Sequence, residues 1–257
     1  MQKEAEKFVD SSLMEGMFSI RAILRASEDG MNDRKIERVL FDKEKTKSKA
    51  RELSFLRAKA KEHGFSVDFV DGAKIDEMTI GNSHGGIVAV CTERTVPSVY
   101  DMKIKDNGFY VMLEGIEDPY NFGYSLRSLY AMGCSGVILT ERNWMSAAGV
   151  VARSSAGASE MFTVYKSNPV DCVRYFKERG YKVVCADENT DNILGECQLK
   201  LPILLIVGGE KRGISRSVID SADILVKIGY DREFRASLSA ASATTMFAYD
   251  ISRQNKK

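Results

Sequence analysis

Apolar positions in the N-terminal part of the chain follow two different periods. Helical spacing of apolar residues predicts helices over residues 15–26 and 48–63. The alternating or continuous apolar runs that predict short strands lie within residues 34–42, 65–70 and 85–91. These patterns predict a small α/β domain over residues 1–96, followed by a linker over residues 97–108 that contains Pro97 and Gly108.

From residue 109 onward the chain repeats a strand-then-helix pattern. The apolar runs that predict strands are 109–114, 136–140, 161–165, 182–186, 203–207 and, more weakly, 224–228. The segments with helical periodicity are about 122–132, 145–153, 169–179, 215–220 and 236–254. This alternation is typical of a mostly parallel sheet covered on both faces by helices. We therefore predict an α/β domain over residues 109–257, with ligands bound at the carboxyl ends of its strands.

Composition excludes several classes of protein. With 44% hydrophobic and 28% charged residues in 257, the chain has the composition of a globular protein. No apolar run approaches the roughly 20 residues of a membrane helix, and the N-terminus lacks the apolar core of a signal peptide. Five scattered cysteines without a Cys-x-x-Cys pair, and only two histidines, argue against disulfides and against a zinc site. We expect a reduced, cytoplasmic protein without a metal.

The loop after the first strand of the second domain contains a distinctive set of residues. Asp118-Pro119 favours a turn, and Asn121 is suited to cap the helix that follows. Gly123 and Arg127 are four residues apart and therefore share one side of that helix. A capped helix with a solvated arginine explains the same pattern as a catalytic loop does.

A glycine-rich loop follows the strand 203–207. Gly208 and Gly209 directly after a buried strand let a ligand approach the backbone, and Glu210 and Gly213 continue the loop. The loop is not a Walker loop, and no strand is followed by Gly-x-Gly-x-x-Gly. A tight turn before a helix remains an alternative.

A third loop leads from a strand end into a helix of small side chains. It begins near Ile228 and passes through Ser237 and Leu238 to Ala243. Small side chains also fill residues 152–158, where a helix terminus and turn would explain them. Close packing of an interior helix is the alternative to a ligand site in the third loop.

Taken in order, these loops resemble the three signature motifs of the SpoU (TrmH) family of RNA 2′-O-methyltransferases in the SPOUT superfamily. The first motif, Asn-x-Gly-x-x-x-Arg, is matched by Asn121, Gly123 and Arg127. The second, Gly-x-Glu-x-x-Gly-hydrophobic-Ser, is matched by Gly208, Glu210, Gly213, Ile214 and Ser215. The stretch at 152–158 is similar to the family's Ser-x-Gly-Ala segment.

The third motif, Ser-Leu-Asn-hydrophobic-Ser-x-Ala, is matched only in part. Ser237, Leu238 and Ala243 agree, whereas Ser239 replaces the asparagine and Ala241 replaces the second serine. In the family this segment closes the adenine end of the cofactor pocket, so the departures bear on cofactor affinity and activity. A serine hydroxyl makes hydrogen bonds over a shorter reach than an amide.

The N-terminal part resembles the family's ribosomal-protein-like substrate-binding domain. Residues 15–24 are similar to its opening Gly-x-x-x-Val-x-x-x-Leu helix, and residues 84–87 (His-Gly-Gly-Ile) to its closing His-Gln-Gly-Ile. The resemblance implies an α/β fold with a mostly parallel sheet and a C-terminal trefoil knot, preceded by a smaller α/β RNA-binding domain. It also implies a homodimer.

The resemblance further implies a cofactor, S-adenosyl-L-methionine, and roles for individual residues. The residues implied to hold the cofactor are Gly208, Gly209, Glu210, Gly213, Ile228, Ser237 and Leu238. The implied catalytic residues are Arg127, Asn121 and Glu210. Because an arginine with a pKa above about 12 is a poor base, we expect Arg127 to position the nucleotide and stabilise oxyanion charge, with Asn121 and Glu210 orienting it.

Basic residues are concentrated in one segment of the chain. Residues 34–61 contain eleven basic and four acidic side chains, whereas the net charge of the whole chain is +1. Such a block neutralises RNA phosphates, although a solvated helix face is the alternative. The residues predicted to bind RNA are Arg34, Lys35, Arg38, Lys43, Lys45, Lys47, Lys49, Arg232 and Arg235.

The favoured hypothesis is therefore S-adenosylmethionine-dependent methylation of a ribose 2′-hydroxyl in RNA, with ribosomal RNA as the expected substrate. The alternative is a catalytically impaired RNA-binding protein of the same fold, acting in ribosome assembly or regulation, and the altered third motif favours it. A nucleotide-dependent oxidoreductase would require a glycine fingerprint that the chain lacks.

Overall fold

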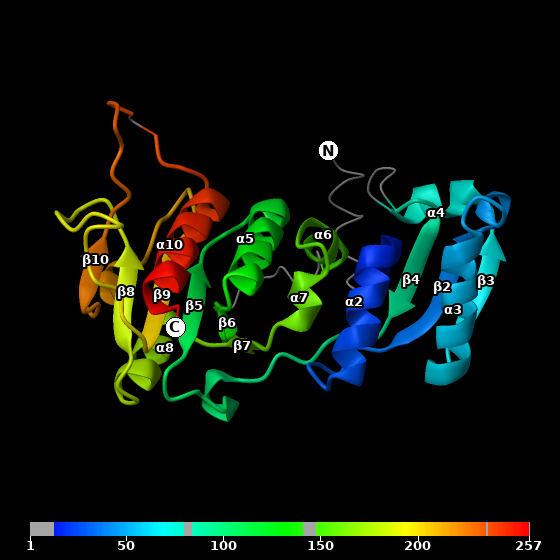
Figure 1. Cartoon of the computed structure of the whole chain (residues 1–257), viewed down its shortest axis with the longest axis horizontal. Coiled ribbons are helices and arrows are strands. Elements are labelled where there is room, and N and C mark those ends of the chain that lie inside the picture. Colours follow the sequence, from blue (N-terminus) through cyan, green and yellow to red (C-terminus); the bar gives the residue numbers. More distant parts are fainter. Residues whose placement is uncertain (1–12, 80–83, 141–147, 235, 257) are drawn as a thin grey trace. The chain divides into compact units, whose positions relative to one another are not determined.

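The computed structural model describes residues 13–79, 84–140, 148–234 and 236–256. The chain divides into two compact units (Figure 1). One contains Met1–Thr95 and Asn143–Met161, and the other contains Val96–Arg142 and Phe162–Lys257. The predicted domains follow the chain in order, whereas here one segment from the second half packs with the first unit. The linker over 97–108 stays a prediction.

The first unit is built on a four-stranded mixed sheet. Its strand order is β1 (Leu13–Glu15), β4 (Ile87–Cys91), β2 (Ile36–Asp42) and β3 (Ser66–Val70). Strands β2 and β3 are parallel, and β4 is antiparallel to both of its neighbours. The helices are α2 (Gly16–Glu28), η1 (Lys43–Lys45), α3 (Ala50–His63), α4 (Gly72–Met78), α6 (Ala148–Ser154) and α7 (Ala158–Met161).

The apolar stripe of α2 forms the centre of this unit's core. Ile20 and Ile23 are buried in one cluster with Phe41 of β2, Leu56 of α3 and Ile87 of β4. Ala148 and Ala152 of α6 belong to the same cluster, which explains why the segment from the second half packs here. The predicted helices and strands of this part are confirmed within a few residues. Strand β1 and helices α4 and α7 had no periodic signal long enough to predict them.

The second unit is built on a six-stranded sheet in which every pairing is parallel. Its order is β10 (Ile224–Val226), β8 (Lys182–Ala186), β9 (Ile203–Gly208), β5 (Phe109–Glu114), β6 (Gly136–Leu139) and β7 (Val164–Lys166). The helices are η2 (Val99–Asp101), α5 (Pro119–Ala131), α8 (Pro169–Lys177), α9 (Arg216–Ile219) and α10 (Ala240–Asn255). The prediction of an α/β fold with a mostly parallel sheet is confirmed, and the trefoil knot stays a prediction.

Alternate side chains of each strand face opposite sides of this sheet. Tyr110 and Leu204 belong to a buried cluster with Phe176 of α8 and Val218 of α9. Helices α5 and α10 pack against each other, and α10 contacts β9 (Figure 1). Layers on both faces leave the carboxyl ends of the strands as the place for loops that bind ligands. Within the described ranges, no helix is both long and apolar enough to span a bilayer.

Candidate functional site

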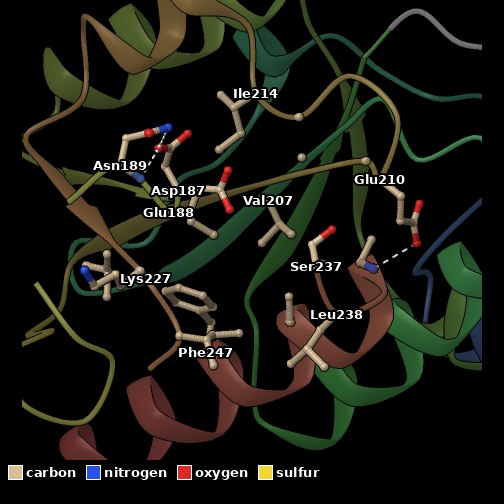
Figure 2. Close-up of a pocket in the computed structure, with 18 of the residues that line it drawn as sticks. Asp187, Glu188, Asn189, Val207, Glu210, Ile214, Lys227, Ser237, Leu238 and Phe247 are labelled. Atoms are coloured by element: carbon tan, nitrogen blue, oxygen red, sulfur yellow. Dashed lines mark hydrogen bonds between the residues drawn. The ribbon is translucent and has the colours of Figure 1, made fainter. Parts of the chain in front are cut away.

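A pocket of about 530 Å³ lies at the carboxyl ends of β8, β9 and β10. Loops after these strands and the start of α10 line it (Figure 2). Its apolar lining includes Val207, Ile214, Leu238 and Phe247. All seven residues predicted to hold the cofactor line this pocket: Gly208, Gly209, Glu210, Gly213, Ile228, Ser237 and Leu238. The sequence motifs therefore converge on one cavity.

The glycines of the loop after β9 are required by the loop's own packing. A Cβ atom on Gly208 would lie 2.4 Å from the carbonyl carbon of Gly213, and one on Gly209 would lie 2.0 Å from the carbonyl oxygen of Gly115. The amide of Gly209 donates to the Glu114 carbonyl, and the amide of Gly213 donates to the Gly209 carbonyl. The expected ligand approach does not explain Gly208 and Gly209, because protein backbone occupies the space beside both.

The Glu210 carboxylate joins the first and third motifs. Its Oε1 accepts a hydrogen bond of 2.9 Å from Nδ2 of Asn121 in α5. The same oxygen accepts a bond of 2.9 Å from the backbone amide of Ala240, the first residue of α10. A carboxylate at a helix N-terminus also interacts favourably with the helix dipole. Glu210 thereby fixes α5, the loop after β9 and α10 at the edge of the pocket.

The prediction that Asn121 caps α5 is wrong. Asp118 is the N-cap residue, and its Oδ1 accepts a bond of 3.0 Å from the Tyr120 amide. The Asn121 side chain, one turn into the helix, is therefore available to Glu210.

Arg127 lies on the exposed side of α5 and does not line the pocket. Within the ranges that the structure covers, its guanidinium forms no hydrogen bond or ion pair. Gly123, four residues earlier on the same helix, is buried, whereas Arg127 is exposed to solvent. The catalytic role of Arg127 stays a prediction.

The altered third motif begins α10 with a serine cap. Ser239 is the N-cap residue, and its Oγ accepts a bond of 3.2 Å from the Ser242 amide. The two hydroxyl oxygens, Oγ of Ser239 and Oγ of Ser242, are 3.1 Å apart. Serine and asparagine are about equally good N-caps, so the replacement preserves this function of the position.

The structure adds polar residues to the pocket that the motifs did not indicate. Asp187, Glu188 and Asn189 follow β8 and line one side of it (Figure 2). Oδ1 of Asp187 accepts bonds of 2.8 Å and 2.9 Å from the backbone and side-chain nitrogens of Asn189. The signal for them was a run of polar residues directly after a buried strand. With Glu210 they give the lining three carboxylates against one ammonium, that of Lys227.

The predicted RNA-binding residues of the first unit divide into two groups. Lys35, Arg38, Lys43 and Lys47 are exposed, and Lys45 and Lys49 are half-buried. Arg34 instead is 2% exposed, and its Nε lies 3.1 Å from Oε2 of the buried Glu160. The prediction that Arg34 binds RNA is therefore wrong, because its guanidinium is enclosed and paired. Arg232 is exposed on the loop before α10, and Arg235 lies outside the described residues.

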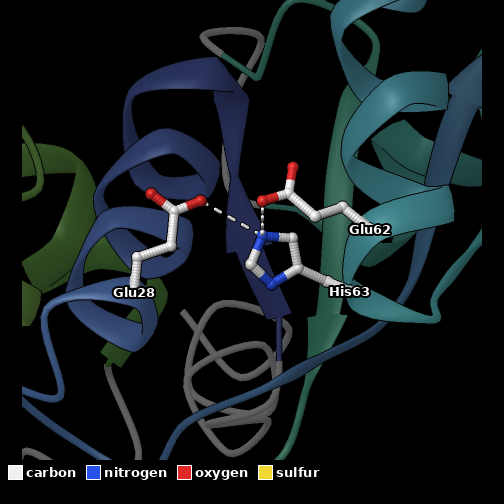
Figure 3. Close-up of side chains that lie close together, drawn as sticks. All are labelled: Glu28, Glu62 and His63. Atoms are coloured by element: carbon white, nitrogen blue, oxygen red, sulfur yellow. Dashed lines mark hydrogen bonds and ion pairs between the residues drawn. The ribbon is translucent and has the colours of Figure 1, made fainter.

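One group of side chains has the composition of a metal site. The ligand atoms of Glu28, Glu62 and His63 lie within 4.8 Å of one another (Figure 3). The Lys59 ammonium, however, donates a bond of 2.8 Å to each carboxylate. That hydrogen bond to Lys59 lowers the pKa of Glu28. The group is an exposed ion-pair cluster that links α2 to α3.

Fold and pocket together define an α/β protein that binds a small molecule at the ends of parallel strands. Residues 108–249 match the model of the SpoU rRNA Methylase family. Residues 13–97 match the model described as RNA 2′-O ribose methyltransferase substrate binding. The chain therefore belongs to the SpoU rRNA methylase family and is an RNA methyltransferase of that family.

Individual relatives agree with this assignment. The 23S rRNA (guanosine-2′-O-)-methyltransferase RlmB of Shewanella oneidensis is 28% identical over 209 residues, covering 79% of this chain and 85% of that protein. The SpoU methyltransferase AviRb of Streptomyces viridochromogenes, solved with AdoMet, has a TM-score of 0.78 at 22% identity and covers 98% of this chain and 97% of its own. The AdoMet-bound rRNA methyltransferase of Sinorhizobium meliloti has a TM-score of 0.79 at 19% identity, covering 99% and 95%. At these identities the two solved structures establish the fold.

Proposed function

We propose that this protein transfers the methyl group of S-adenosylmethionine to a ribose 2′-hydroxyl of RNA, with ribosomal RNA as substrate. The observation that supports it most directly is the junction at Glu210, whose one oxygen binds both Asn121 and the N-terminus of α10 at the edge of the pocket. All three motifs of a SpoU methyltransferase meet there. The RlmB relative is a 23S rRNA (guanosine-2′-O-)-methyltransferase, which agrees with this substrate.

The pocket suits the proposed cofactor in size and charge. A volume of about 530 Å³ lies within the range of small-molecule sites, about 300–1,000 Å³. Val207, Ile214, Leu238 and Phe247 offer an apolar surface for a flat base. The excess of carboxylates, from Asp187, Glu188 and Glu210, favours a ligand that carries a sulfonium and an ammonium group.

The residues of this chain would position the reactants. When bound, S-adenosylmethionine would supply an electrophilic methyl group to the ribose oxygen, with S-adenosylhomocysteine as the leaving group and water taking the hydroxyl proton. Glu210 and Asn121 fix the relative placement of α5 and α10 beside the pocket. Arg127, exposed and without a partner within the described ranges, is available to a phosphate or to the developing oxyanion.

We also propose that the protein acts as a homodimer through α5 and α10. These adjacent helices carry four exposed large side chains, Tyr124, Tyr130, Met246 and Tyr249, with exposures of 47%, 43%, 42% and 55%. A second copy of the same face would remove them from water. Sedimentation velocity of the wild-type chain and of a Tyr249→Glu variant tests this: a wild-type dimer and a monomeric variant are expected.

A methyl-transfer assay with matched arginine variants tests the proposed reaction. Wild-type protein, tritiated S-adenosylmethionine and ribosomal RNA are expected to give a 2′-O-methylated nucleoside on digestion and mass spectrometry. Arg127→Ala is expected to abolish transfer while calorimetry shows unchanged cofactor binding. Arg174→Ala, which removes an exposed arginine on α8 outside the pocket, is the control and should keep full activity.

The same calorimetry helps to distinguish the proposed enzyme from the catalytically impaired RNA-binding protein. That alternative draws its support from Ser239 and Ala241 in the third motif. Saturable binding of one cofactor per chain would remove that support, and methyl transfer by the wild-type protein would exclude the alternative. A folded protein that binds RNA but neither S-adenosylmethionine nor its demethylated product would instead overturn the proposed enzyme.

A further inference from the structure

Two aromatic rings stand at the mouth of the pocket, on the loop between β10 and α10. Tyr230 and Phe234 are 43% and 56% exposed, and both belong to the pocket lining. Their ring centroids are 5.9 Å apart with an interplanar angle of 72°. Neither ring belongs to the three family motifs. Large aromatic surface left open beside a binding pocket indicates a second binding partner there.

The loop that carries these rings is hydrogen-bonded to the segment that binds Glu210. The phenol oxygen of Tyr230 accepts a hydrogen bond of 3.2 Å from the Leu238 amide. Two residues further on, the Ala240 amide donates to Glu210. Two hydrogen bonds therefore tie the loop that carries Tyr230 to the segment before α10, and that segment to Glu210.

We propose that Tyr230 and Phe234 form a stacking platform for a base of the substrate RNA, which places the adjoining ribose at the pocket. This inference rests on the proposed function and names the part of the substrate that this loop contacts. A ribose inside a folded RNA is reached when its nucleotide is splayed out, and splayed bases are commonly stacked on aromatic side chains. Every base has a π face, so such a platform supports binding without selecting one sequence.

Charge on the loop argues for stacking over phosphate binding. Arg232 lies between Asp231 and Glu233, so the segment between the two rings is not basic. The rings therefore offer this loop an uncharged means of binding RNA, beside the phosphate contacts predicted for Arg232 and Arg235. Exposed lysines of the first unit, such as Lys35 and Lys47, add to phosphate neutralisation.

The position of the rings also distinguishes RNA from the cofactor as their partner. Val207, Ile214, Leu238 and Phe247 supply apolar surface inside the cavity, whereas Tyr230 and Phe234 are 43% and 56% exposed as residues. A ligand that fills the cavity would leave these outer faces uncovered. A base arriving from outside would cover them.

Binding of two probe oligomers to ring variants tests the platform. One probe is a fluorescein-labelled single-stranded RNA 12-mer of mixed sequence, and the other is an abasic oligomer with the same number of phosphates. Phe234→Leu, which keeps apolar bulk but removes the π face, is expected to weaken RNA binding about 5- to 150-fold by anisotropy. Phe234→Tyr is expected to retain wild-type affinity. All variants should bind the abasic oligomer equally.

Two further variants distinguish the contribution of the Tyr230 ring from that of its hydrogen bond to Leu238. Tyr230→Phe removes the bond to Leu238 but keeps the ring, and Tyr230→Leu removes both, so only the second is expected to lose RNA affinity. Tyr100→Leu is the matched control, because Tyr100 is an exposed aromatic residue of the same unit (59%) that does not line the pocket.

Four outcomes would overturn the platform. These are wild-type RNA affinity in Phe234→Leu, an equal loss toward the abasic oligomer, a loss confined to S-adenosylmethionine in calorimetry, or a change of oligomeric mass in sedimentation. Failure of the proposed function is seen separately, as absence of methyl transfer by the wild-type protein to ribosomal RNA. The oligomer titrations do not depend on that transfer.

Discussion

The buried ion pair between Arg34 and Glu160 makes a sharp prediction about stability. The two side chains are 2% and 4% exposed. Nη1 of Arg34 also donates to the Thr92 carbonyl, at 3.0 Å. A second buried arginine, Arg94, donates to the Ser159 carbonyl at 2.7 Å, and burial lowers its pKa while the charge of Glu160 raises it. One carboxylate thus serves two enclosed cations.

Removing that carboxylate should cost more than removing either cation. Glu160→Gln leaves Arg34 enclosed without its counter-charge and leaves Arg94 with the charge of Asp33. Breaking a buried pair in this way costs about 3–5 kcal/mol. Arg34→Met leaves Glu160 with Arg94, so its cost should be smaller. The double variant Arg34→Met/Glu160→Gln should be closer to the wild type than Glu160→Gln alone, because it no longer encloses Arg34 without a counter-charge.

Hydrogen exchange in urea measures the free energy of unfolding of the first unit alone. Mass spectrometry of peptides from β2 and β4 reports that unit's opening, whereas a spectroscopic melt averages both units. With a urea dependence of about 2 kcal/mol per molar, Glu160→Gln should lower the midpoint by about 1.5–2.5 M. A loss under about 1 kcal/mol, or a larger loss in Arg34→Met than in Glu160→Gln, would refute the reasoning.

Three other predictions concern the cap, the junction and the thiols. Ser239→Asn should leave the free energy of unfolding unchanged, and Ser239→Ala should lower it by about 1 kcal/mol in urea titration, since serine and asparagine cap helices equally well. Glu210→Gln removes the anion that binds Asn121 and the Ala240 amide, so calorimetry should show weaker cofactor binding than in Arg127→Ala; equal affinities would contradict this. Burial raises the pKa of the Cys91 and Cys185 thiols to about 12, so a disulfide reagent at pH 8 should label them only after unfolding. Their stabilising contribution is complete below the ordinary thiol pKa of 9.0 and is lost as the pH rises toward 12, and native labelling at pH 8 would contradict the assignment.

Local patterns predicted the elements with long apolar runs and failed for the short ones. The strands at 109–114 and 182–186 have the predicted bounds, since continuous apolar residues mark a strand buried on both faces. Strand β1, of three residues, and helix α7, of four, are too short for any periodicity. Both depend on contacts made far along the chain.

Arg34 shows why distant contacts limit a prediction from sequence. It begins a run of basic residues, and that run suggested a solvated RNA-binding segment. Its burial is decided by Glu160, 126 positions away, on a segment that leaves the second unit and packs with the first. No local pattern contains that information.

The sequence motifs predicted only those pocket residues that belong to a motif. The other residues of the lining were missed. All seven predicted cofactor residues line one pocket because their motifs follow β9 and β10, two parallel strands that only β8 separates in the sheet. Asp187, Tyr230 and Phe234 line the same pocket but belong to no motif. These lining residues were therefore found only in three dimensions.

The structure also changes how the altered third motif should be weighed. Glu210 binds α10 through the backbone amide of Ala240, a contact that any side chain at positions 239 and 241 leaves in place. The helix start needs an oxygen acceptor at position 239, and the Ser239 hydroxyl provides one. Ala241 is 8% exposed, so it packs as a buried small residue. Because these substitutions preserve the cap, the helix and the junction with Asn121, the altered motif gives little support to a loss of catalysis.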